Sequence, residues 1–269
     1  MHNVDFPTPK RIVYLAIIWI FGAVVLSYPF LFPPKEIDLF DEANIAPYIE
    51  QEMPNFAEIE SIVDRKKAFF DYLLPAINHH NKVILQKREF LNEIRDVINQ
   101  DQPFSSLQQK RLDALIEEYR IDPDEDLVAM IARLMRRVDI IPVELVLMQA
   151  ANESAWGTSR FAQKGYNFFG LWCFKKGCGF VPKRRNDDAA HEVAKFRSLD
   201  HAVGTYFRNI NRHYAYAELR QIRLNLRNSD SKITAEKLAK GLKSYSERGE
   251  DYIEELISMI RFNRKFMSL

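Results

Sequence analysis

The sequence predicts a mainly α protein with a small β lobe and a single N-terminal transmembrane helix. Apolar residues recur at steps of three and four along most of the 269-residue chain, which is the period of a half-buried helix. Glycine is scarce, at nine residues, as a helical chain requires. Between residues 161 and 197, glycines, aromatic residues and a proline replace the helical pattern. There "HEVAKFR" alternates weakly in polarity, which predicts a strand of a small hairpin.

The composition is that of a globular protein and excludes several functional classes. Lysine and arginine (38) balance aspartate and glutamate (37), so no positive excess indicates a nucleic-acid partner. The sequence contains no Gly-x-Ser-x-Gly motif, no phosphate-binding loop and no dinucleotide fingerprint. We therefore expect no cofactor. We also expect no metal site, because the two cysteines have no second cysteine or histidine pair at zinc spacing.

Residues 12–32 form an apolar run without any charge, directly after Lys10 and Arg11. About 20 apolar residues cross the hydrocarbon core of a bilayer, so this run is expected to be a membrane anchor. The basic pair predicts that residues 1–11 are cytoplasmic and that the rest of the chain lies across the membrane. A cleaved signal peptide is the alternative, but the run exceeds a usual signal core and has no clear small-x-small cleavage site.

The remaining segments follow in a simple order. Residues 33–55 are acidic and interrupted by prolines, which predicts a linker. A helical region is expected over 56–137, with a long stripe to about residue 100 that Pro75 kinks or splits, and helices at 106–119 and 124–137. A second domain is expected over 138–269, where Ser198 and Thr234 can cap helices. Its predicted helices are 142–156, 199–211, 235–242 and 250–266.

One carboxylate continues the buried face of the helix at 142–156. Val146 and Ala150 lie on that face, and Glu153 stands seven and three residues after them. Burial penalises a charged carboxylate and raises its pKa, so Glu153 could stay protonated and act as a general acid. The alternative is that a lone glutamate near a helix end faces solvent or pairs with a cation.

Two aromatic motifs lie downstream of this acid. "GYNFFGLW" (165–172) places aromatic residues and an asparagine in a short loop flanked by glycines. "TYFRNINRHYAY" (205–216) adds three tyrosines. Aromatic faces can stack on sugar rings, and a tyrosine hydroxyl can orient a water or stabilise a developing positive charge. Each of these residues could instead be part of the core.

Three ordered motifs, "ANESAWGTSRFA", "YNFFGLW" and "VAKFRSLDHAVGTYFRNINRHYAY", resemble glycoside hydrolase family 73 over roughly residues 142–216. The resemblance implies a lysozyme-like α+β fold and a bacterial endo-β-N-acetylglucosaminidase that cleaves β-1,4 bonds in the glycan strands of peptidoglycan. It implies that Glu153 is the general acid and Tyr216 a catalytic tyrosine. It implies that Asn167, Phe168 and Gly170 form the family's asparagine–aromatic–glycine loop. The further candidate sugar-binding residues are Trp156, Tyr166 and Tyr206. With the anchor, the chain is expected to be a single-pass protein of the bacterial inner membrane with its body in the periplasm.

The second acid of several family members has no clear match here. Basic residues (183–185) occupy roughly its place, and the nearby candidates are Asp187, Asp188 and Glu192. Glycosidases commonly use two carboxylates, about 5 Å apart for retention and roughly 6.5–9.5 Å apart for inversion. The stereochemistry therefore stays open, and so does attack by the substrate's own N-acetyl group.

Two further alternatives remain at this level. Cys173 and Cys178 can form a local disulfide if the body lies in an oxidising compartment, or they can remain reduced. The chain could also be a lytic transglycosylase, or a wall-binding scaffold protein whose site has degenerated. Analysis of the products distinguishes a lytic transglycosylase from a hydrolase, and the Glu153→Gln variant distinguishes a degenerate scaffold protein from an enzyme.

Overall fold

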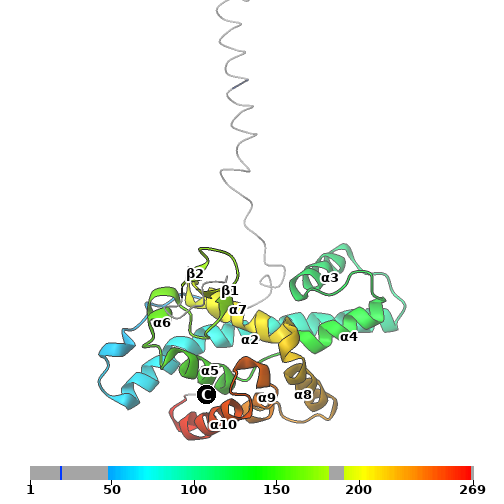
Figure 1. Ribbon diagram of the computed structural model, residues 1–269. Helices are drawn as coiled ribbons and strands as arrows, with labels where there is room; N and C mark the ends of the chain where they lie inside the picture. Colours follow the sequence, from blue (N-terminus) through cyan, green and yellow to red (C-terminus); the bar gives the residue numbers. More distant parts are fainter. Residues whose placement is uncertain (1–18, 20–47, 182–190, 268–269) are drawn as a thin grey trace, which may run out of the picture. The chain divides into compact units, whose positions relative to one another are not determined.

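Helices make up most of the described chain, as the sequence predicts, and a short three-stranded sheet interrupts them (Figure 1). The computed structural model describes residue 19 and residues 48–181 and 191–267. Residues 40–269 form one compact unit. The helical region 56–137 and the predicted domain 138–269 pack together in it, since α2 (Ile62–Asn99) contacts both α5 (Val143–Ser154) and α7 (Leu199–Arg212).

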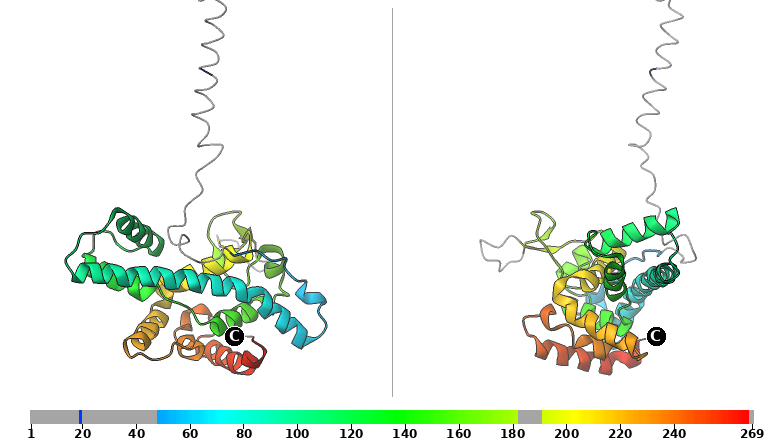
Figure 2. Two further views of the ribbon diagram at one scale, coloured as in Figure 1. Left: turned by 180° about the vertical axis from the view of Figure 1, so that it is seen from behind. Right: turned by 90° about the vertical axis from the view of Figure 1, so that its right-hand side faces the viewer.

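The long helix α2 organises this unit. Ser61 caps its first turn by accepting a hydrogen bond from the backbone N–H of Asp64, at 3.3 Å. Pro75 does not split the helix, which continues for 38 residues, although Figure 2 shows it bending in its N-terminal part. Proline removes one backbone hydrogen bond, but the buried residues before and after it, such as Leu73 and Ile77, hold both halves against the core.

The predicted helices 106–119 and 124–137 correspond to α3 (Ser106–Tyr119) and α4 (Leu127–Arg137). The second begins later than expected because Asp126, not Asp124, caps it. Ser105 and Gln108 form a reciprocal capping box at the start of α3. At the other end Arg120 adopts a left-handed conformation, with φ of 52°, which turns the chain back toward α4.

Helix α5 runs through the core between α2 and α10 (Glu250–Asn263) (Figure 1). It stops at Ser154, two residues before the predicted end, because Ala155 and Trp156 both have positive φ, at 50° and 57°. The Ser154 hydroxyl donates to the Ala150 carbonyl at 2.6 Å and accepts from the Gly157 N–H at 2.9 Å. These bonds fix the sharp stop just after Glu153.

The C-terminal half contains helices that the sequence predicts and two that it does not. Ser198 caps α7 and Thr234 caps α9 (Ala235–Ala239) as expected, while α9 and α10 end earlier than predicted. The additional helices are α6 (Arg160–Gly165) and α8 (Ala217–Asn228). The described chain also holds short 3-10 turns at Phe56–Glu58, Tyr214–Tyr216, Lys243–Tyr245 and Arg264–Phe266.

Helix α8 was not predicted from the spacing of apolar residues, because the side chains that it buries include arginines. Its Arg223 is 1% exposed and donates hydrogen bonds to the carbonyls of Asp139 and Ile140, both at 3.0 Å. Arg227 binds the buried Asp139 carboxylate through two hydrogen bonds of 3.0 and 2.7 Å, and Arg88 from α2 approaches it to 3.4 Å. This ionic cluster joins α2, α8 and the turn that leads into α5.

The β lobe comprises β1 (Trp172–Cys173), β2 (Gly179–Phe180) and β3 (Glu192–Ala194). The predicted strand in "HEVAKFR" exists as β3, which pairs antiparallel with the preceding strand β2, as in the predicted hairpin, and also with β1, so that it is the central strand of the order β1-β3-β2. Both pairings are antiparallel, with Trp172 opposite Val193 and Gly179 opposite Ala194. A Cβ at Gly179 would lie 2.0 Å from the Val193 carbonyl oxygen, so only glycine fits there.

Among the described residues, no helix combines the length and apolar character needed to cross a bilayer. The predicted anchor at 12–32 lies outside them except for Trp19, as does most of the predicted linker 33–55.

Candidate active site

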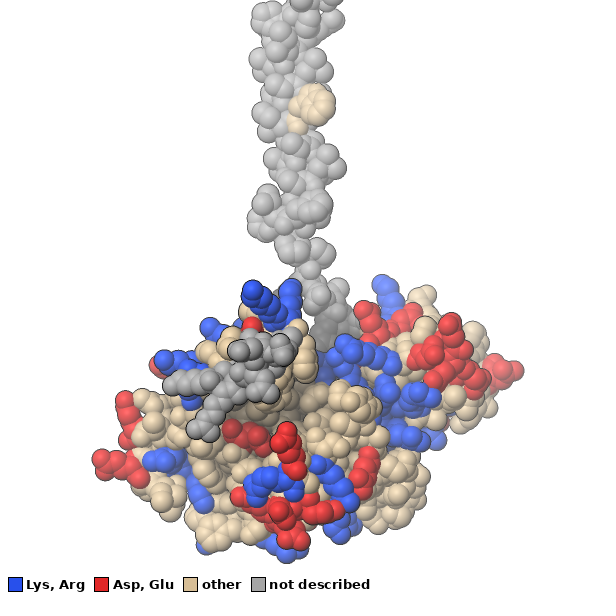
Figure 3. Space-filling view, viewed as in Figure 1, with Lys and Arg blue, Asp and Glu red and all other residues tan. Residues whose placement is uncertain are grey.

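A groove of about 650 Å³ opens beside the C-terminal end of α5. Glu153 and the loop Phe169–Trp172 line the groove, and so do residues of α7. On the face shown in Figure 3, the surface is hollowed beside a group of Lys and Arg side chains over the C-terminal ends of α4 and α7. The groove therefore brings an acid, an aromatic loop and a basic end into one surface feature.

Glu153 is half-buried at the end of α5, as its position on the apolar stripe predicts. Burial raises the pKa of its carboxyl, and the negative charge of Glu255 adds to this, while a hydrogen bond from Tyr252 and the charge of Arg248 act against it. The net direction is upward. A raised pKa keeps more of the carboxyl protonated near neutrality, which is the property of a general acid.

A chain of hydrogen bonds through the core holds this carboxyl in place. The Tyr206 hydroxyl donates to the Gln149 side-chain oxygen at 2.5 Å, and the Gln149 amide donates to the Tyr252 hydroxyl at 3.1 Å. Tyr252 in turn is hydrogen-bonded to Glu153. Burial raises the pKa of Tyr252, so its hydroxyl remains a donor. Elements α7, α5 and α10 thus fix the acid jointly.

Tyr216 lies in the groove with Glu153, as the resemblance implies. Burial raises the pKa of its hydroxyl to about 12, although a hydrogen bond with Asn209 acts in the opposite direction. The hydroxyl is therefore protonated at neutral pH and can donate or accept a hydrogen bond. Tyr245 packs beside it, with ring centres 5.9 Å apart, and donates to the Phe169 carbonyl at 2.8 Å, which fastens the aromatic loop.

Exposed aromatic side chains surround the acid. Trp172 is 49% exposed, Phe174 80% and Tyr214 83%, and all three line the groove. Such flat apolar faces at the surface suit stacking on sugar rings.

Several predicted sugar-binding residues lie behind the groove. Asn167 is 1% exposed, and its side chain bonds the carbonyls of Leu171 and Ala194 and the N–H of Leu171. The Phe168 and Tyr206 side chains are fully buried, and Tyr206 stacks under Phe169 with ring centres 4.3 Å apart. In this structure these residues shape the loop and do not reach the groove.

Tyr166 and Trp156 also lie away from the acid. Tyr166 packs against the small cluster of Ala194, Phe196 and Ala202 under the β lobe. Trp156 lines a separate hollow on the other side of α5, where Lys66 sits 4.7 Å from the centre of its ring. Of the predicted binding residues, only Gly170 lines the groove with Glu153.

Glu192 occupies the β lobe and is absent from the described groove lining. Its two carboxylate oxygens accept hydrogen bonds from the backbone N–H groups of Gly177 and Gly179, at 2.9 and 2.8 Å. Glu192 therefore organises the loop between β1 and β2 through these two hydrogen bonds. The other candidates, Asp187 and Asp188, lie outside the described residues. Of the described residues that line the groove, Glu153 is the only acidic one.

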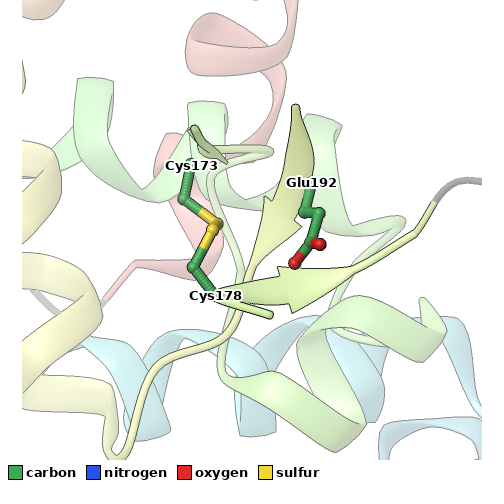
Figure 4. Close-up of side chains that lie close together, drawn as sticks. All are labelled: Cys173, Cys178 and Glu192. Carbon is green, nitrogen blue, oxygen red and sulfur yellow. A yellow bond between two sulfur atoms is a disulfide. The ribbon is translucent and has the colours of Figure 1, made fainter. Parts of the chain in front are cut away.

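Cys173 and Cys178 are joined by a disulfide, with Cα atoms 6.2 Å apart (Figure 4). Their sulfur atoms and a Glu192 oxygen lie within 4.8 Å of one another, a spacing that could suit a metal ion. The groups do not fit one, because disulfide sulfurs are not thiolates and both Glu192 oxygens already accept hydrogen bonds. The disulfide closes the loop that carries Phe174 to the groove.

Sequence reasoning missed the residues that support the acid. Gln149 stands four residues before Glu153 on the same helix face, so helical spacing could have indicated it. Tyr245 and Tyr252 come from about a hundred residues downstream, and no local pattern links them to Glu153. The packing of α10 against α5 brings Tyr252 to Glu153, and Tyr245 lies in the 3-10 turn Lys243–Tyr245, which packs against α10.

Gly170 permits close contact between the loop and the acid. Its φ is +63°, and an added Cβ would lie 3.0 Å from the Glu153 Oε2 atom. We expect Gly170→Ala to lower kcat about 10- to 100-fold by displacing the carboxyl. Gly177→Ala is the matched control, because it has φ of +81° but no atom within 4 Å of the added Cβ. It should cost about 1 kcal/mol of stability and leave kcat unchanged. Equal losses in both variants would refute the steric explanation.

A mainly α fold with a small β lobe, and a helix-end acid in an aromatic groove, define a glycosidase-type site. The chain belongs to the glucosaminidase family, glycoside hydrolase family 73, as its motifs indicate: the family profile, described as mannosyl-glycoprotein endo-beta-N-acetylglucosaminidase, matches residues 128–265. The chain is 31% identical to Protein bax of Escherichia coli (strain K12) over 218 residues, which cover 80% of this chain and 76% of that protein. No solved structure matches it significantly. It therefore carries a glycoside hydrolase domain, and family membership implies peptidoglycan as the substrate.

Proposed function

We propose that this chain is an endo-β-N-acetylglucosaminidase that hydrolyses the β-1,4 bond on the reducing side of N-acetylglucosamine in peptidoglycan. The observation that carries the proposal is the Glu153 carboxyl, which burial keeps at a raised pKa in the wall of an open groove lined by aromatic residues. Family membership supplies the substrate class. The groove, open at the surface, suits an internal segment of a long polymer.

In the proposed reaction, Glu153 donates its proton to the glycosidic oxygen while the bond to the anomeric carbon breaks. The leaving sugar departs with a new hydroxyl group, and positive charge develops on the cleaved sugar. The Tyr216 hydroxyl, in the same groove, can stabilise that charge or orient the water that attacks. Glu153, then ionised, can take a proton from the water, which restores its starting state.

The single carboxylate in the described groove lining favours assistance by the substrate. The carbonyl oxygen of the N-acetyl group would attack the anomeric carbon as the glycosidic bond breaks, and water would then open the resulting ring. Asp188 is the alternative second group. Asp188→Asn should retain activity if the acetamide assists. Loss of activity with an unchanged melting temperature would assign the role to Asp188.

Digestion of purified peptidoglycan tests the activity. Reduction of the products with borohydride, followed by mass spectrometry, should find N-acetylglucosamine at the new reducing end. A 1,6-anhydro product without uptake of water would instead identify a lytic transglycosylase. Absence of any cleavage would identify a binding or scaffold protein.

We also propose that residues 12–32 anchor the protein in the bacterial inner membrane, with the body in the periplasm. The uncharged run behind Lys10 and Arg11 supports this, and a disulfide suits an oxidising compartment. Alkaline carbonate extraction of cell membranes should leave the chain in the pellet. Its release would refute the anchor.

Tyr252 gives the proposed acid a testable pH dependence. Its hydrogen bond lowers the pKa of Glu153 against the effect of burial, so Tyr252→Phe should raise that pKa further. A general acid is active while protonated, and the alkaline limb of the kcat profile should therefore move to higher pH. Tyr206→Phe should move it less, because Tyr206 acts on Glu153 only through Gln149 and Tyr252. A limb that stays fixed or moves to lower pH in Tyr252→Phe would contradict this role.

A further inference from the structure

The end of the groove away from the aromatic loop is lined by four arginines, Arg120, Arg137, Arg208 and Arg212. Two of them belong to α7, where Thr205, Arg208, Asn209 and Arg212 lie at helical spacing along the side that faces the groove. The same stripe therefore carries Asn209, which contacts Tyr216, and continues into the basic end. A polymer lying along α7 would pass from the acid to the arginines.

These side chains are held in place by contacts with the protein. The Arg212 guanidinium donates to the Glu118 carbonyl at 2.9 Å, and Arg208 donates to the Thr205 hydroxyl at 3.0 Å. Arg137 donates to the carbonyls of Tyr119 and Arg120 at the end of α3. Each of these guanidinium groups has further N–H donors in a planar fork, so the donors that line the groove are preorganised for a second partner.

The nearby acids are already engaged. Glu118 pairs with Lys87 at 2.7 Å, and Glu125 pairs with Arg133 at 2.8 Å. Burial lowers the pKa of Arg212, and the charges of Arg120 and Arg208 lower it further, so the cations repel one another. Within the described lining, Glu153 is the only acidic side chain. An anionic ligand would relieve this repulsion.

We propose that the arginine end of the groove binds the carboxylates of the stem peptides attached to the glycan strand, so that the protein recognises peptide-bearing glycan in preference to bare glycan. The inference rests on the proposed function. N-acetylglucosamine carries no charge, whereas the peptides beside it carry carboxylates. Arginine binds a carboxylate through two parallel hydrogen bonds, which gives geometric selectivity as well as attraction.

Binding measurements test this separately from catalysis. The full-length Glu153→Gln variant would be titrated with soluble glycan fragments of one length. They would either carry their stem peptides or be bare, that is, freed of the peptides by an amidase and with the lactyl carboxylates that this exposes converted to amides. We expect removal of the peptides to raise Kd about tenfold or more. In a variant that also carries Arg208→Gln and Arg212→Gln, binding of the peptide-bearing fragment should weaken to nearly the Kd of the bare fragment, and binding of the bare fragment should be unchanged.

A control with the same net charge separates contact from long-range attraction. Arg133→Gln with Arg136→Gln removes two arginines from α4 that are absent from the groove lining, and should preserve the preference for peptide-bearing fragments. Equal affinity of the parent for both fragments would overturn the proposal. So would equal weakening of both fragments by the Arg208 and Arg212 changes. Because binding is read without turnover, a failure of the proposed hydrolysis would leave this result interpretable.

Discussion

Replacing Glu153 by glutamine should lower the rate of peptidoglycan hydrolysis about 10²- to 10⁴-fold, the usual contribution of a general acid. Glutamine keeps the shape of the side chain and can still accept the hydrogen bond from Tyr252, but it has no proton to give to the glycosidic oxygen. The measurement is the release of new reducing ends from purified peptidoglycan. Glu144→Gln is the matched control, because Glu144 lies on the same helix but faces Arg264, 3.7 Å away.

The same substitution should make the protein more stable at neutral pH. Burial raises the pKa of Glu153 in the folded state, so its stabilising contribution is present below its ordinary pKa and is lost as the pH rises through the raised value. Above the ordinary pKa, the burial that disfavours the ionised carboxylate is therefore a cost to folding that glutamine removes. We expect a melting temperature higher by roughly 2 °C, with the difference disappearing below about pH 4. Equal rates of hydrolysis in wild type and variant would remove the basis of the proposed function.

Asp139→Asn should produce the largest loss of stability. Asp139 is 2% exposed and receives two hydrogen bonds from Arg227, with Arg88 and Arg223 close by. Neutralising the carboxylate leaves buried guanidinium charges without their counter-charge, which typically costs about 3–5 kcal/mol. For a unit of this size we expect the melting temperature to fall by about 10 °C. Asp113→Asn, on the exposed face of α3, should change it by less than about 1 °C.

The pH dependence of this loss has a defined sign. Burial would raise the pKa of Asp139, but the hydrogen bond from Arg227 and the charges of Arg223 and Arg88 together lower it below its ordinary value. The stabilisation is therefore complete above the unfolded-state pKa and is lost as the pH falls through the lowered value. Urea unfolding of both proteins should give curves that converge below about pH 4. A constant difference down to pH 2 would show that the loss has another origin.

The helices that bury an apolar stripe could be predicted from the sequence, because helical spacing records burial directly. Glu153 was found in the same way, as an acid on such a stripe. The helix α8 could not, since its buried residues include Arg220 and Arg223, whose burial depends on carbonyls from distant segments. Pro75 is tolerated within α2 for a related reason, since tertiary packing outweighs the single missing backbone bond.

The site was only partly predictable for a physical reason of its own. A motif shows which residue types occur together, but not which of their side chains point outward. Phe168 and Phe169 are adjacent in "NFFG", yet Phe169 reaches the groove lining and Phe168 packs among Phe56, Phe69 and Tyr72. The support of Glu153 by Tyr252, and the arginine end of the groove, depend on contacts between distant segments.

The burial of Phe168 also sets a lower limit to the size of the working enzyme. The family match begins at residue 128, whereas Phe56, Phe69 and Tyr72, which enclose this ring, all precede it. A fragment that begins at that boundary would expose an apolar surface to solvent directly beneath the loop that holds Gly170 against the acid. The upstream helices are therefore an integral part of the hydrolase and not a detachable accessory.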